Sequence, residues 1–169
     1  EPDRGDIIVF KTPADNRTDY VKRLIGMPGD TVQFIDKNLY LNGEIIYKEK
    51  IEKLGNITCG NEIFDANFYK EKLPNGKEYI AAYRSNGTMI NSDKFIVPDN
   101  HYFFMGDNRD CSKDSRFLSS VGYVNFNNLV GKAQIIFFSN DKKKGSIFKF
   151  WKLNKSIRID RLFKKILWY

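Results

Sequence analysis

Short apolar runs, each bounded by turn residues, recur along this chain of 169 residues and limit what it can fold into. Such runs lie at residues 6–10, 18–25, 31–35, 79–84, 94–97, 101–105 and 133–138. The segment 39–47 adds Asn42-Gly43 between two apolar stretches, which is the strongest short-range signal for a β-hairpin. Many short strands separated by turns predict a mainly β domain.

Composition divides the chain into three parts. Residues 1–47 and 94–140 contain the clearest strand patterns, and we expect them to form one β core. Residues 48–93 are polar and rich in Lys, Asn and Gly, so we interpret them as a variable insertion or a second β lobe. Residues 141–169 form a basic tail.

The net charge of +7 comes from this tail. Ten Lys/Arg and two Asp give residues 141–169 a charge of +8, which leaves −1 for residues 1–140. Apolar residues of the tail follow helical spacing and predict an amphipathic helix: Ile159, Leu162, Phe163, Ile166 and Leu167. Basic amphipathic helices often bind membrane surfaces. Helices of the same pattern equally often pack with their apolar face on the core of their own protein. The body is not basic and shows no nucleic-acid-binding motif, so we expect no nucleic-acid partner.

No apolar run is long enough to cross a membrane, and no signal peptide is visible. The redox state of the two cysteines, Cys59 and Cys111, stays open. An oxidising compartment would permit a disulfide, but the spacing of the two residues does not require one. Two thiols without nearby His or further Cys fall short of a zinc site, so we expect no metal or other cofactor.

The segment 106–116 (Gly-Asp-Asn-Arg-Asp-Cys-Ser-Lys-Asp-Ser-Arg) crowds acids, hydroxyls and arginines directly after the apolar run 102–105. Such a loop can fold on itself through Asp–Arg pairs and side-chain-to-backbone hydrogen bonds. A rigid polar loop at a strand end is also a good place to hold catalytic groups. On its own, this composition favours a turn whose polar groups bond one another over a catalytic loop.

Lys22 lies within the run 18–25, where strand geometry places it on one face with Tyr20 and Leu24. Burial between apolar neighbours disfavours an ammonium group and lowers its pKa, which makes neutral lysine available as a general base near neutral pH. The alternative is a lysine whose stem packs while its amine stays in water. Pro28-Gly29, just beyond this run, predicts a type II turn.

Three segments in this order resemble conserved boxes of the bacterial type I signal peptidases: Arg4-Gly5-Asp6, Lys22-Arg23-x-x-Gly26-x-Pro28-Gly29-Asp30 and the loop 106–116. The resemblance covers residues 4–30 and about 98–138. It implies a catalytic core of coiled antiparallel β-sheets, to which the chain adds the β insertion and the C-terminal amphipathic helix. It also implies a serine endopeptidase that uses a Ser/Lys dyad to remove signal peptides from exported preproteins, after small residues in an Ala-x-Ala pattern. The family acts at the extracytoplasmic face of the bacterial cytoplasmic membrane.

The resemblance assigns roles to matching residues. Lys22 would be the general base, and Ser112 would hydrogen-bond its amine and orient it. Four further residues look like supports of this pair. Arg23 and Asp107 would form a charge pair, and Asp114 and Arg116 would hold the loop. The substrate would bind as an extended strand, with pockets for its small side chains lined by Val9, Asp19, Tyr20 and Val21.

Two positions depart from the family pattern. The nucleophilic serine of the family lies in an earlier Ser-x-Met-Pro box, and no serine occurs between Glu1 and Lys22. We therefore expect the nucleophile and the membrane anchor to lie upstream of this chain, which as given should be inactive. The sequence does not exclude Ser112 or Ser115 as the nucleophile. Cys111 stands where the family usually has asparagine.

Two other functions stay open from the sequence. One is a soluble, self-cleaving Ser/Lys peptidase of the repressor type, although that type lacks the Gly-Asp-Asn-Arg-Asp pattern. The other is a non-catalytic relative that acts as a membrane-associated scaffold.

Overall fold

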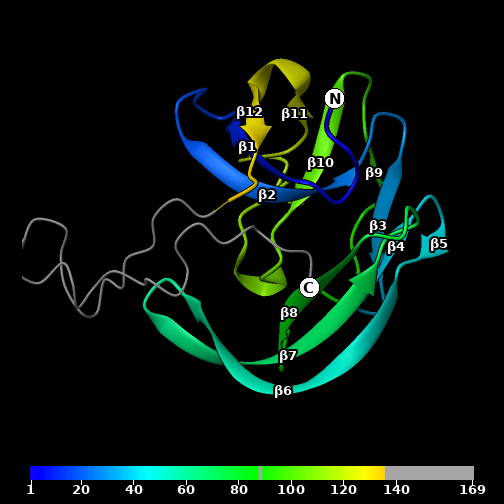
Figure 1. Cartoon of the computed structure of the whole chain (residues 1–169), viewed down its shortest axis with the longest axis vertical. Helices are drawn as coiled ribbons and strands as arrows, with labels where there is room; N and C mark the ends of the chain where they lie inside the picture. Colours follow the sequence, from blue (N-terminus) through cyan, green and yellow to red (C-terminus); the bar gives the residue numbers. More distant parts are fainter. Residues whose placement is uncertain (88, 136–169) are drawn as a thin grey trace, which may run out of the picture. The chain divides into compact units, whose positions relative to one another are not determined.

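Strands dominate the described part of the chain, as the sequence predicts. The computed structural model describes residues 1–87 and 89–135, which contain twelve strands and two short 3-10 turns (Figure 1). The basic tail 141–169, its predicted helix and residues 136–138 of the last predicted strand lie outside the described residues. Within the described part, no helix is both long and apolar enough to cross a membrane. Residues 1–132 belong to one compact unit.

A five-stranded antiparallel sheet forms the centre of this unit. Its order is β11-β10-β2-β1-β12, with β1 at Ile7–Lys11, β2 at Asp19–Gly26, β10 at His101–Met105, β11 at Val124–Asn125 and β12 at Leu129–Lys132. β1 pairs with β2 from Ile7↔Arg23 to Lys11↔Asp19. β10 pairs only with the inner end of β2, from Phe103↔Gly26 to Met105↔Arg23. The outer half of β2, residues 19–22, therefore extends past the end of β10.

The second sheet has the order β5-β4-β3-β9, with β3 at Thr31–Ile35, β4 at Asn38–Leu41, β5 at Glu44–Ile45 and β9 at Phe95–Ile96. Its β4–β5 hairpin confirms the prediction from Asn42-Gly43. Asn42 and Gly43 have φ values of 54° and 81°, and a type I′ turn needs positive φ at both positions. The predicted Pro28-Gly29 turn is also present, since the Asp30 N–H donates to the Met27 carbonyl and Gly29 has a φ of 83°.

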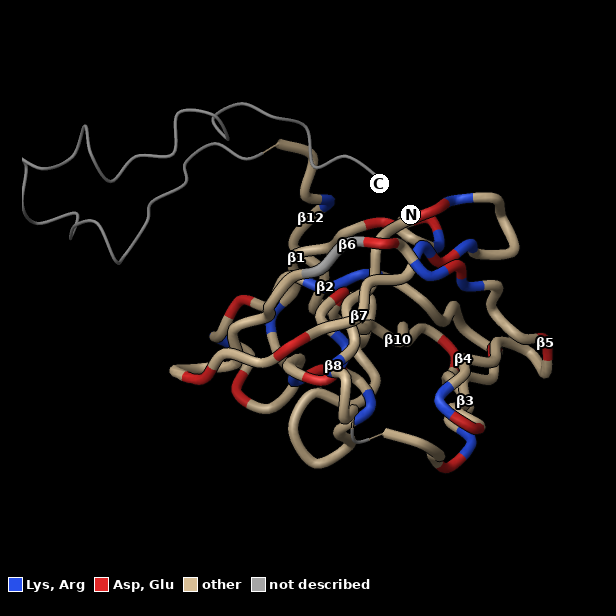
Figure 2. Tube along the Cα trace, turned by 90° about the horizontal axis from the view of Figure 1, so that it is seen from below, with Lys and Arg blue, Asp and Glu red and all other residues tan. Residues whose placement is uncertain are grey.

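The third sheet is a ribbon of long strands, β6 at Tyr47–Cys59, β7 at Glu62–Lys72 and β8 at Glu78–Arg84. Figure 1 shows these strands curving together. The sequence predicted only the last strand, because β6 and β7 are polar and lack an apolar alternation long enough to stand out. Figure 2 shows basic and acidic residues interspersed along the described trace, in line with the small net charge of residues 1–140.

β2 separates two apolar cores, because alternate side chains of a strand point to opposite faces. Leu24 packs with Ile8, Phe10 and Phe104 in one cluster. The next residue, Ile25, packs in the other cluster with residues of the second and third sheets, including Val32, Phe34 and Tyr79. The strand that carries Lys22 is therefore held from both sides, which makes it a rigid support for a functional group.

Candidate active site

Lys22 occupies the outer half of β2 and is half-buried. Its amine lies 5.5 Å from the centroid of the Tyr20 ring, which confirms the shared face expected from strand alternation. Burial is the largest influence on the amine and lowers the pKa of Lys22 below its ordinary value of 10.5. The carboxylates of Asp114 and Asp107 raise the pKa, and Arg116 lowers it further. The net lowering favours the neutral amine that a general base requires.

Ser112 and Lys22 converge at Gly106, which lies where the loop leaves β10. A Cβ atom on Gly106 would lie 2.2 Å from the Ser112 Oγ and 3.6 Å from the Lys22 Nζ. The two side chains therefore face the same small volume, and only glycine leaves room for the serine. The Ser112 hydroxyl is 9% exposed as a residue and makes no hydrogen bond of good geometry within the described part. It still lowers the pKa of the Asp114 carboxyl, which places it close to that group.

Asp114 and Arg116 fold the loop onto itself. The Arg116 guanidinium donates to both carboxylate oxygens of Asp114, from Nε to Oδ1 at 2.8 Å and from Nη2 to Oδ2 at 2.8 Å. The Gly106 N–H donates to the Asp114 Oδ2 at 2.9 Å. Burial raises the pKa of Asp114, but the Arg116 bonds and charge and the Gly106 N–H outweigh it and leave the pKa below its usual value. The carboxylate therefore stays ionised and closes the loop directly at Gly106.

Arg23 and Asp107 form the charge pair that the sequence predicts. The Arg23 Nε donates to the Asp107 Oδ1 at 2.7 Å, and the Nη2 donates to the Oδ2 at 2.6 Å. Arg23 also donates from Nη1 to the Gly5 carbonyl at 2.8 Å and lies over the Tyr79 ring. This one side chain ties β2 to the loop and to the Arg4-Gly5-Asp6 segment.

Ser115, the other serine of the loop, is fully buried. Its hydroxyl accepts a hydrogen bond from the Phe104 N–H at 2.9 Å, and its own N–H donates to the Phe104 carbonyl. A hydroxyl held in this way against β10 cannot reach a substrate. Of the two loop serines, only Ser112 faces Lys22.

The model of the family described as signal peptidase, peptidase S26, matches residues 1–138. The chain belongs to this family. A protein named signal peptidase I from Rickettsia typhi (strain Wilmington) is 40% identical over 181 residues, which cover 98% of this chain and 66% of the relative. A protein of the same name from Rickettsia bellii (strain OSU 85-389) is 42% identical over 180 residues, covering 98% and 60%. The chain thus spans less than two thirds of the length of these relatives.

A solved structure shows a weaker likeness. The crystal structure of a signal peptidase I from Enterococcus faecalis V583 matches with a TM-score of 0.46 and 29% identity, covering 78% of this chain and 96% of that chain.

The four residues predicted to bind substrate lie around the outer end of β2 in this S26 family member. Val9 lies directly opposite Val21 on the neighbouring strand, so these two share one face. Tyr20 lies on the other face with Lys22, and Asp19 pairs with Lys11 at 2.8 Å. Val21 is 54% exposed. The structure therefore brings the four together around one strand end but divides them between the two faces of the sheet.

A buried network that the sequence did not predict holds the first half of the loop. The Arg109 Nη2 donates to the Glu71 Oε2 at 2.7 Å, and both side chains are 1% exposed. The hydroxyls of Tyr79 and Tyr83 donate to the same carboxylate and accept from Arg109. Arg109 belongs to the recognisable loop motif, but Glu71 lies in β7, inside the segment that resembled nothing. The motif could suggest the arginine and not its partner.

The two cysteines, whose state the sequence left open, form a disulfide. Cys59 ends β6 and Cys111 ends the 3-10 turn η1 at Arg109–Cys111, with Cα atoms 5.3 Å apart. Cys111 directly precedes Ser112. The bond therefore joins the ribbon to the residue next to the candidate orienting serine.

Proposed function

We propose that this protein is a signal peptidase I, a serine endopeptidase that removes N-terminal signal peptides from exported preproteins after small residues. The observation that carries the proposal is the convergence of Lys22 and Ser112 at Gly106 in a chain of the S26 family. A half-buried lysine with a lowered pKa beside a buried hydroxyl is the arrangement that Ser/Lys chemistry needs.

In the proposed mechanism, neutral Lys22 takes the proton of the attacking serine and later protonates the leaving amine. Ser112 orients the lysine amine, while Asp114 and Arg116 hold the loop and Arg23 and Asp107 hold it against β2. We assign the nucleophile to a serine other than Ser112 and Ser115. Ser115 is bonded to β10, and Ser112 is enclosed between Gly106 and the loop.

The substrate is proposed to bind as an added strand along residues 19–22 of β2, past the point where β10 ends. Main-chain pairing would supply affinity, and successive substrate side chains would point to opposite faces. Tyr20 beside Lys22 and the Val9–Val21 pair on the other face would then contact alternate substrate residues. This arrangement gives a contact to three of the four predicted residues, on both faces of the strand, and leaves Asp19 at the start of the strand, paired with Lys11.

The proposed location is the bacterial cytoplasmic membrane, with this part of the protein on its extracytoplasmic face. The Cys59–Cys111 disulfide supports the location, because disulfides persist in oxidising compartments. The basic tail 141–169 is proposed to contact anionic lipid at the membrane surface.

The test compares Lys22→Arg with the unchanged protein, using the complete gene product and a peptide that carries an Ala-x-Ala signal sequence. Arginine stays protonated at working pH and cannot act as a base, so we expect kcat to fall by about 100-fold or more. Lys70→Arg is the matched control, a strand lysine paired with Glu78 on the ribbon, and it should cleave normally. Full cleavage by Lys22→Arg would contradict the assigned base. Cleavage that Ser112→Ala alone abolishes completely would show that Ser112 is the nucleophile.

A further inference from the structure

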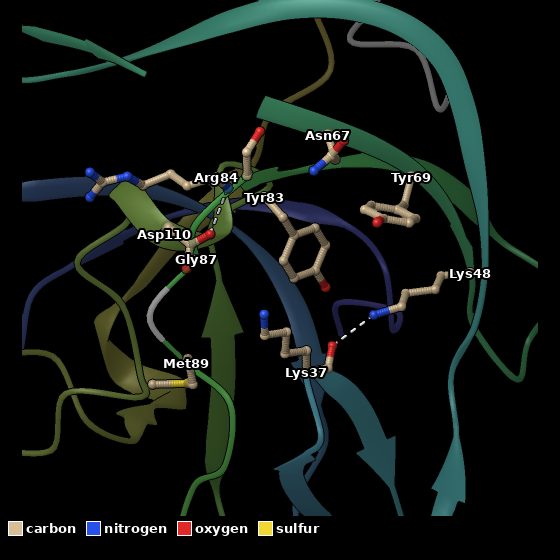
Figure 3. Close-up of a pocket in the computed structure, with 10 residues that line it drawn as sticks. Lys37, Lys48, Asn67, Tyr69, Tyr83, Arg84, Gly87, Met89 and Asp110 are labelled. Atoms are coloured by element: carbon tan, nitrogen blue, oxygen red, sulfur yellow. Dashed lines mark hydrogen bonds between the residues drawn. The ribbon is translucent and has the colours of Figure 1, made fainter. Parts of the chain in front are cut away.

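The first half of the loop lies along β8 and also contacts the second half, because the Gly106 N–H donates to Asp114 and Arg116 donates to the Arg109 carbonyl. The Ala82 N–H donates to the Asp107 carbonyl at 2.8 Å, and Ala82 forms a parallel bridge with Asn108. The Arg84 N–H donates to the Asp110 Oδ2 at 2.8 Å, which Figure 3 shows as a dashed line. The ribbon therefore helps to place residues 107–110, together with Arg23 of β2, which binds the Asp107 carboxylate. The Cys59–Cys111 bond is the covalent end of this interface.

A small apolar cluster supports the ribbon near this bond. Cys59 and Cys111 pack in a small cluster around Ile57, Ala66 and Ala82, apart from the two larger cores. Two of these three buried residues are alanines, and the partly buried Phe64 and Phe68 also pack against the cluster. Regions with few fully buried apolar residues open at low cost, so the covalent link adds a restraint on this end of the loop beside the buried Arg109–Glu71 pair.

Ser112 has almost no freedom to move if it is to face Lys22. Its Oγ and Cβ lie 2.2 and 2.4 Å from the place where a Cβ of Gly106 would be, so the serine fills the space above the glycine. From Asp114 onward the loop is fixed by the Arg116 and Phe104 contacts. On the other side of Ser112, the next covalent neighbour is Cys111. The position of Ser112 is thus set from one side by the loop itself and from the other by the ribbon.

We propose that the Cys59–Cys111 disulfide is a positioning element of the catalytic pair, which holds Ser112 against Lys22 only while the bond is oxidised. The effect of this positioning role on peptide cleavage rests on the function proposed above. Reduction by a dithiol delivers two electrons and two protons, so that Cys59 and Cys111 become thiols and the reductant closes into its own disulfide. The loop then leaves Ser112 free to move, and water reaches the lysine amine.

The direct test follows the Lys22 amine by NMR through a pH titration of this chain, with the signal assigned by Lys22→Arg. Three samples are compared: the oxidised chain, the chain reduced with dithiothreitol, and the variant Cys59→Ser. Cys59 is the cysteine chosen for substitution because it lies 53 positions from Ser112 in the sequence. We expect the pKa of Lys22 to rise in both samples that lack the bond. Burial is the largest cause of the lowered pKa of Lys22, and the Asp114 charge that raises this pKa stays in place because Arg116 and the Gly106 N–H hold it.

Leu41→Ala is the matched control, because Leu41 lies on β4 in the core around Val32 and Phe34, and its truncation leaves a cavity there while the disulfide stays intact. It should lower stability and leave the titration of Lys22 unchanged. An unchanged titration in the reduced, folded chain would overturn the proposal. Complete unfolding on reduction would overturn it as well, since the bond would then stabilise the whole unit and not one loop.

The kinetic test uses the complete gene product in both redox states. We expect reduction to lower kcat on the order of 10- to 100-fold, which is the scale of an ångström-sized misplacement, and to change KM little because β2 is not disturbed. The pH profile of kcat should also move to higher pH. Equal kcat in both states overturns the positioning role. Absence of any cleavage in the oxidised protein contradicts the proposed function instead, while the titration still decides the role of the disulfide.

Discussion

The two halves of the loop that flank Ser112 are held in different ways. The second half is closed by its own residues, with Asp114 bound to Arg116 and to the Gly106 N–H. The first half is held by the ribbon, through the buried Arg109–Glu71 pair and the Cys59–Cys111 bond. One half is thus a local structure, and the other depends on residues 38 and 52 positions away. The comparison teaches that a recognisable motif can contain all of the candidate catalytic residues and only some of the residues that hold the loop in place.

The largest expected effect comes from removing the buried ion pair that joins the first half of the loop to the ribbon. Glu71→Ala leaves the buried Arg109 without its carboxylate, and removing one member of a buried ion pair costs about 3–5 kcal/mol. Urea unfolding of this chain would measure the loss. Glu78→Ala is the matched control, an acid on the neighbouring strand that pairs with Lys70 in solvent, and it should change stability little. Equal effects of the two substitutions would show that the buried network does not anchor the loop.

The contact between the two halves can be tested at Gly106. In Gly106→Ala the new methyl group would overlap Ser112, and forcing extra volume into a packed site costs about 1–3 kcal/mol. Gly131→Ala is the control, because nothing lies within 4 Å of its Cβ position. Thermal unfolding should separate the two variants clearly. Adding Ser112→Gly to Gly106→Ala should recover much of the lost stability, and no recovery would mean that the overlap lies elsewhere.

The second half of the loop should show the smallest of the three effects, as a loss of folding stability at acid pH. The pKa of Asp114 is lower in the folded chain than its ordinary value of 3.8. Its ionised form therefore contributes stability that is fully present above the unfolded pKa and is lost as pH falls through the folded pKa. Urea unfolding at pH 7 and pH 3 would measure this contribution. The uncharged variant Asp114→Asn should be less stable at pH 7 and show a smaller difference between the two pH values. The same difference in both proteins would refute the assignment.

Several features of the fold follow from neighbouring residues and were predictable. The strands at Thr31–Ile35 and His101–Met105 have the predicted bounds, and the Asn42-Gly43 turn forms because its two residues tolerate positive φ. The shared face of Lys22 and Tyr20 follows from strand alternation alone. The long strands β6 and β7 were missed because β6 is largely polar and the alternation in β7 is confined to Phe64, Ala66 and Phe68, and pairing along the ribbon stabilises both strands. The division of the chain into a core, an insertion and a tail stays a prediction.

The sequence by itself determined the residues of the candidate site: a lysine on a strand, a loop of serines and Asp–Arg pairs, and a family that combines them. Only the tertiary structure decided how the first half of that loop is fixed to the ribbon. Glu71 and Cys59 come from a segment without a recognisable motif, and their partners are chosen by how the ribbon packs against the loop. Gly106 was visible as a residue, but its need to be glycine depends on where the Ser112 side chain lies. Spacing along a chain specifies strand faces and turns, whereas contacts between distant segments exist only after the sheets have packed.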